Sequence, residues 1–156
     1  MSSIIIEGSD YFESKTFEAL YVIQLKSLEK YHIVLKYIDK IEQQKQGKLM
    51  GMYSWTKTYV ASKDTYCSQR EWYAGSIVHE SYHSKLYNDY FEKYGSIVPH
   101  HIYGGEEAEY ACLEYQISFL EEIYADKYLI NSAKKYRTQK WWASSYIVGR
   151  IDKSKQ

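Results

Sequence analysis

The sequence is poor in the residues that interrupt helices and in the cysteines that cross-link small secreted domains. Proline occurs once and glycine eight times in 156 residues, so long helices can run without a break. The two cysteines, Cys67 and Cys112, are too few for a disulfide framework. The composition therefore excludes a disulfide-rich scaffold and a proline-rich disordered chain.

An excess of charge of one sign is also missing. The chain has 20 basic and 20 acidic residues, which gives a formal net charge of zero. This balance offers no electrostatic footprint for nucleic acid or for an anionic membrane. No apolar run reaches membrane-spanning length, and the stretch Ile4-Ile5-Ile6 is too short for the apolar part of a secretory signal. We therefore expect a cytoplasmic protein with no nucleic-acid or membrane partner.

Hydrophobic residues make up 45% of the chain, which is enough for a folded core in a protein of this length. Apolar side chains recur every three or four positions over residues 11–46, and this spacing predicts one long amphipathic helix. Aromatic and β-branched residues dominate residues 49–63. They predict a hairpin of strands 49–55 and 58–63 that turns near Thr56.

Helical spacing returns in the second half of the sequence. It predicts helices over 69–94, 106–124 and 126–135, and a further one over 138–147. No linker or internal repeat divides the chain, so we expect a single domain over residues 1–156. A mostly helical domain with a small antiparallel hairpin belongs to the α+β class.

The pentapeptide His79-Glu80-Ser81-Tyr82-His83 is an HExxH motif inside the helix predicted over 69–94. Ser68 and Glu71 have the spacing of a capping box and place the start of that helix well before His79. Histidines four residues apart lie on one helix face, where both imidazoles reach one metal ion. The glutamate beside them is then placed to act on water at that ion.

A catalytic zinc needs a third protein ligand besides the two histidines. No histidine follows His83 at the HExxHxxGxxH spacing. The glycine pair 104–105 is instead followed by an acidic helical segment that contains Glu106, Glu107 and Glu109. His100 and His101, in the loop before it, are further candidates.

An HExxH helix followed by a glutamate-bearing helix resembles the gluzincin metallopeptidases. In several gluzincin branches an aromatic residue follows the liganding glutamate, and a small residue stands three positions after it. The segment Glu109-Tyr110-Ala111-Cys112 fits this pattern best, and the resemblance covers residues 68–116. The resemblance implies a zincin-type active-site helix and a Zn²⁺ ion held by His79, His83 and Glu109. Glu106 and Glu107 stay open as rivals for the third position.

The expected activity is hydrolysis of a peptide or protein substrate by a metal-activated water, with Glu80 as general base. Tyr103 is the candidate for stabilising the oxyanion, with His100 and His101 as alternatives in the same loop. Carboxylates such as Glu114 or Asp126 are candidates for holding the imidazoles. By resemblance, strand 58–63 would be the edge to which an extended peptide adds.

Two other functions fit the same sequence. The first is a non-catalytic zinc protein, a pseudo-peptidase or binding module, whose closed site takes a fourth ligand from His100, His101 or Cys112. The second is a metal-free helical interaction protein, because the 19 tyrosines and four tryptophans are typical of interfaces. The sequence also leaves open whether a protein partner or an inhibitory segment regulates the molecule.

Overall fold

A computed structural model describes residues 3–139 of the chain. It contains a four-stranded sheet made of β1 (Ile5–Glu7), β2 (Lys40–Gln43), β3 (Gly51–Tyr53) and β4 (Thr58–Ala61). The helices are α1 (Asp10–Lys26), α2 (Leu28–Tyr37), α3 (Lys63–Tyr66), α4 (Arg70–Tyr94), α5 (His100–Tyr103), α6 (Gly105–Glu122) and α7 (Lys127–Gln139). A short 3-10 turn, η1 (Ser54–Thr56), joins β3 to β4. The predicted α+β class is confirmed.

The sheet has the strand order β1-β2-β4-β3. The strands β1, β2 and β4 are parallel, and only β3 runs antiparallel, pairing Met52 with Tyr59 of β4. The predicted hairpin is therefore present as β3 and β4, and Lys57 closes its turn with a left-handed backbone at φ 51°. The strand β1 lies within residues 3–7, which the apolar run there predicts as a short strand. The strand β2 was not predicted, because its residues fall within the segment that apolar spacing assigned to a long helix.

The prediction of one helix over 11–46 is wrong. The helix stops at Ser27, a second helix runs to Tyr37, and the chain then enters β2. The buried Ser27 donates a hydrogen bond to Glu122 of α6 over 2.7 Å, a tertiary contact that fixes the break. The apolar spacing continues across the break at Ser27 because α1 and α2 each bury one face against α4.

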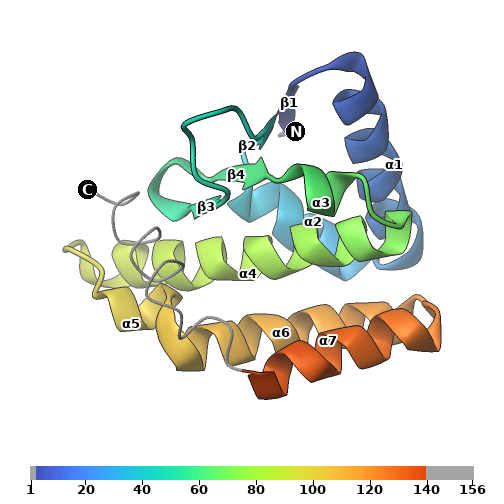
Figure 1. Cartoon of the computed structure of the whole chain (residues 1–156). Helices are drawn as coiled ribbons and strands as arrows, with labels where there is room; N and C mark the ends of the chain where they lie inside the picture. The colour runs from blue at the N-terminus through green and yellow to red at the C-terminus, as the bar shows by residue number, and fades with distance from the viewer. Residues whose placement is uncertain (1–2, 140–156) are drawn as a thin grey trace.

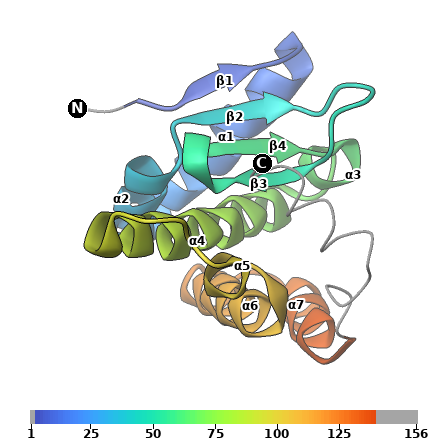
Figure 2. The ribbon, with the colours of Figure 1, turned by 90° about the vertical axis from the view of Figure 1, so that its left-hand side faces the viewer.

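The molecule is layered around α4. Figures 1 and 2 show α4 between two layers, the sheet with α1 and α2 on one side and the pair α6 and α7 on the other. The contacts agree, since α4 packs against α1, α2, β3 and α6. The residues of the HExxH motif therefore lie at the centre of the domain.

The helix predicted over 69–94 matches α4 closely, although Ser68 is not its cap. Gln69 is the N-cap residue, and the Ser68 hydroxyl donates to the Thr65 carbonyl. At the other end Gly95 takes a left-handed conformation, φ 60°, and closes the helix. The glutamate helix predicted over 106–124 is α6, and the helix predicted over 126–135 is the start of α7. The helix predicted over 138–147 falls almost wholly outside the described residues.

Among residues 3–139, no helix combines the length and the apolar character needed to cross a membrane.

Candidate metal centre

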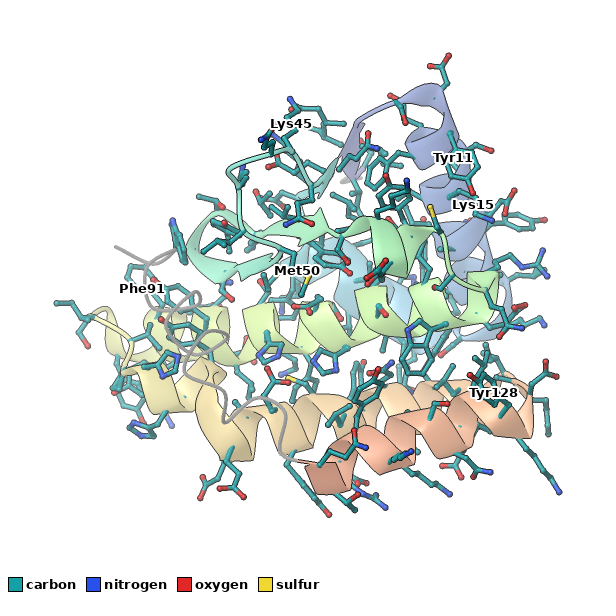
Figure 3. All side chains as sticks on the ribbon, in the orientation of Figure 1. Tyr11, Lys15, Lys45, Met50, Phe91 and Tyr128 are labelled. Carbon is teal, nitrogen blue, oxygen red and sulfur yellow. The ribbon has the colours of Figure 1, made fainter. Side chains whose placement is uncertain are left out.

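The α4 helix places His79 and His83 one turn apart on the face that meets α6. Both side chains are buried, and their Nε2 atoms are 3.2 Å apart. Two imidazole nitrogens at this separation point to one place, which is the arrangement expected from their four-residue spacing. The side chains of α4 and α6 fill the space between the two helices (Figure 3).

The α6 helix supplies two more donors to the same place. Oε1 of Glu109 lies 2.9 Å from Nε2 of His83, and Oε2 lies 3.3 Å from Nε2 of His79. Cys112, one turn further along α6, is fully buried. The donor atoms of His79, His83 and Cys112 lie within 4.8 Å of one another, so this buried group can hold a metal ion.

The outer nitrogens of both imidazoles are hydrogen-bonded to protein groups. Nδ1 of His79 donates to Oε1 of Gln116 over 3.0 Å, and Nδ1 of His83 donates to the carbonyl of Tyr103 over 2.7 Å. An imidazole that donates through Nδ1 keeps the Nε2 lone pair for a metal. The predicted carboxylate partners are wrong for these positions. Glu114 pairs with Arg137, and Asp126 offers its carbonyl to the first turn of α7.

The pKa shifts of the buried donors show that positive charge is favoured between them. Burial alone would raise the pKa of Glu109, but the neighbouring His83 and His79 hold it well below its usual value. Burial alone would lower the pKa of His83, but electrostatic interactions and hydrogen bonds with Cys112 and Glu109 raise it well above the usual value. The buried carboxylate therefore requires positive charge at the Nε2 atoms, whether from protons or from a cation.

The donor set fits a metal ion such as zinc. It combines two imidazoles, a carboxylate and a thiol, which are the ligand types that Zn²⁺ takes in proteins. Oε2 of Glu109 is buried and, within the described part of the chain, accepts no hydrogen bond of good geometry. A buried carboxylate oxygen in that state is suited to a cation. The residue types present therefore fit a single ion, and the spacing of His79, His83 and Cys112 fits it as well.

A cleft of about 290 Å³ opens beside this group. Only His79 among the four donors lines it, together with Glu80 from the same helix. Burial raises the pKa of the Tyr59 hydroxyl well above its usual value, and the Glu80 carboxylate adds to the shift. Glu80 is thus near Tyr59 in the wall of the cleft, whereas Glu109 and Cys112 are buried and do not line it.

The upper wall of the cleft is formed by the edge of the sheet. Met50 and Gly51 line it, and Figure 3 shows Met50 on the side of α4 that carries the strands. The predicted edge strand, residues 58–63, is wrong in this respect, because β4 is paired on both sides. Among the described strands, the sheet has two edges, β1 and β3, and the one beside the cleft is β3 because β4 lies between β3 and β2.

The other predicted site residues add no side chain to the group of four donors. Glu106 and Glu107 are exposed, and so is His101. The ring of Tyr103 is buried against Tyr87, with centroids 5.0 Å apart, and is not part of the cleft wall. Its role as oxyanion stabiliser stays a prediction, whereas its main-chain carbonyl has a defined place against His83.

Two contributors were not assigned from the sequence. Gln116 shares the α6 face of Glu109 and Cys112, at the seven-residue spacing that identifies such a face, so the signal for it was present. The Tyr103 carbonyl carried no signal, because a main-chain group is the same at every position.

Comparison of the chain with protein-family models, with curated proteins and with solved structures finds no match in any of the three.

Proposed function

We propose that this protein is a zinc-dependent metallopeptidase. His79, His83 and Glu109 would hold the ion. The observation that carries the proposal is the meeting of both Nε2 atoms and the Glu109 carboxylate at one buried place. That place borders a cleft whose wall contains Glu80. Zn²⁺ bound there would supply a Lewis acid and lower the pKa of water towards neutrality.

Glu80 is the general base of the proposed reaction. It is half-buried, faces the cleft and lies next to the metal-binding His79 in the sequence. A carboxylate in that position takes a proton from the attacking water and returns it to the leaving amine. Gln116 and the Tyr103 carbonyl keep both imidazoles in the tautomer and orientation that the ligand role requires.

The substrate of the proposed enzyme is an extended peptide that lies along β3. An unpaired strand edge offers main-chain donors and acceptors to such a peptide. Met50 and Gly51 at this edge line the same cleft as Glu80, so a peptide paired there passes the proposed base. The edge places the peptide's main chain, and the cleft wall receives its side chains.

The test combines zinc content with cleavage of a peptide library. The Glu80→Gln variant should keep one zinc per chain and lose hydrolysis by about 100-fold or more, because only the base is removed. His79→Ala should lose both zinc and hydrolysis. Glu92→Gln, an exposed acid on the same helix, is the matched control and should behave as the native protein. Hydrolysis by a zinc-free His79→Ala protein would contradict the proposal.

A non-catalytic zinc protein is the second candidate, and Cys112 is the observation that favours it. Its thiol joins the histidines on the buried side, where a fourth protein donor would close the site. Zinc that is retained in the native protein together with no hydrolysis of any peptide would favour this candidate.

A further inference from the structure

We propose that Cys112 is a fourth protein ligand of the metal ion, so that the centre at rest is closed by His79, His83, Glu109 and Cys112. This inference rests on the metal site of the proposed function. It adds regulation of that site, because a closed centre is a latent one.

The position of Cys112 carries the inference. Cys112 follows Glu109 by three residues on α6, a spacing that places both side chains on one helix face. Its donor atom is within 4.8 Å of those of both histidines. Donors around one zinc are about 3.5 Å apart, which follows from Zn–N and Zn–S lengths of about 2.0 and 2.3 Å. Small side-chain adjustments therefore bring the thiol to bonding distance.

Packing alone does not require a thiol at this place. A small residue there would let α4 and α6 approach, and alanine would serve equally well. The close approach is already made one turn away, where Gly75 faces Leu120 and Gln116. A buried cysteine is common by itself, but this one shares its surroundings with two imidazoles and a carboxylate.

Coordination by Cys112 has a defined chemical cost and consequence. The thiol gives up its proton to solvent, and the sulfur forms the bond to the metal as a thiolate. Four protein donors then complete the tetrahedral shell that is typical of structural zinc. Water enters only when the thiolate leaves or the ion takes a fifth ligand. Cys112 is fully buried and does not line the cleft. The ligand that closes the metal centre therefore comes from the packed interior of the domain.

Cobalt(II) substitution tests the assignment without relying on activity. Thiolate bound to Co²⁺ gives an intense charge-transfer absorption in the near ultraviolet, which nitrogen and oxygen ligands do not give. The native protein should show this band in proportion to the bound cobalt, and Cys112→Ala should bind cobalt without it. Cys67→Ala removes the exposed cysteine and is the matched control that should keep the band.

A cobalt-loaded native protein without the band, or a Cys112→Ala protein that retains it, would overturn the assignment. Cys112→Ser preserves the size of the side chain and replaces the alanine variant if that variant does not fold. Glu109→Ala is an independent check. It should keep cobalt and the band through the remaining three donors, whereas the double variant Glu109→Ala/Cys112→Ala should lose the metal.

Failure of this inference can be told from failure of the proposed function. If the thiolate band is present but no peptide is hydrolysed, even by zinc-loaded Cys112→Ala, Cys112 is supported as a metal ligand and the proposed peptidase activity is contradicted. If peptide is hydrolysed but the thiolate band is absent, the peptidase activity is supported and Cys112 is not a ligand. If both hold, zinc-loaded Cys112→Ala should hydrolyse peptide faster than the native protein at equal zinc content, because its fourth position is open to water. A native protein that binds no cobalt overturns both.

Discussion

The imidazoles of His79 and His83 are oriented by one amide side chain and one main-chain carbonyl. The carbonyl is fixed by the backbone at the end of α5 and cannot be removed by a side-chain change. The amide of Gln116 can be removed. It is buried and accepts the Nδ1 proton of His79 over 3.0 Å. Single-residue effects on metal binding should therefore be clearest at this position.

Replacing Gln116 with leucine should weaken zinc binding by about 10- to 100-fold, since the hydrogen bond that orients His79 is lost while the volume is kept. Titration against a chelator of known affinity measures the change. The exposed Gln46 provides the control, and Gln46→Leu should bind zinc as the native protein does. An unchanged affinity in Gln116→Leu would mean that packing alone positions the imidazole.

The contact between α4 and α6 decides whether the donors meet at all. His79 and His83 come from one helix, and Glu109 and Cys112 from the other. Gly75 lies one turn before His79, and a Cβ atom built there would be 3.3 Å from Leu120 and 3.4 Å from Gln116. The two helices thus leave little room at this point for any side chain larger than a methyl group.

A Gly75→Leu substitution should force the helices apart and lower the free energy of unfolding by about 1–3 kcal/mol, the usual effect of overfilling a packed interior. Zinc affinity should fall with it, because the α6 donors move away from the histidines. Denaturant unfolding and zinc titration measure the two effects. Ser118→Leu, on the exposed face of α6, should change neither. Unchanged zinc affinity in a destabilised Gly75→Leu protein would separate the site from the helix contact.

At the scale of the whole molecule, the proposed ion is a tertiary cross-link. Its donors span residues 79 to 112 and join the helix at the centre of the domain to the helix of the outer layer. A ligand that binds only the folded state stabilises that state by mass action. The stability of the entire domain should therefore depend on the metal.

Zinc in 100-fold excess over its Kd should raise the free energy of unfolding by about 2.7 kcal/mol. For a chain of this length that amounts to a rise in Tm of about 5–10 °C. Calorimetry with zinc and after chelation measures the difference, and His83→Ala should show no such response. An identical Tm in both conditions would favour the metal-free interaction protein.

The sequence and the structure agree where local pattern and tertiary contacts favour the same conformation. The α4 helix is long, without proline, and helical in its apolar spacing, so both of its predicted ends were within one residue. The helix over 11–46 failed because the break at Ser27 is held by Glu122, a residue 95 positions away. The apolar spacing within residues 11–46 carries no information about a hydrogen-bond partner so far along the chain.

Residue spacing within one segment is enough to predict the helical α+β character, the α4 helix and the placement of His79, Glu80 and His83 on it. The remaining features of the site follow from tertiary packing. This packing buries Glu109 and leaves Glu106 and Glu107 exposed, brings Cys112 to the histidines, and makes β3 rather than β4 an edge strand. These outcomes depend on how α6 and the strands pack on α4, and packing joins residues whose separation along the chain carries no periodic signal.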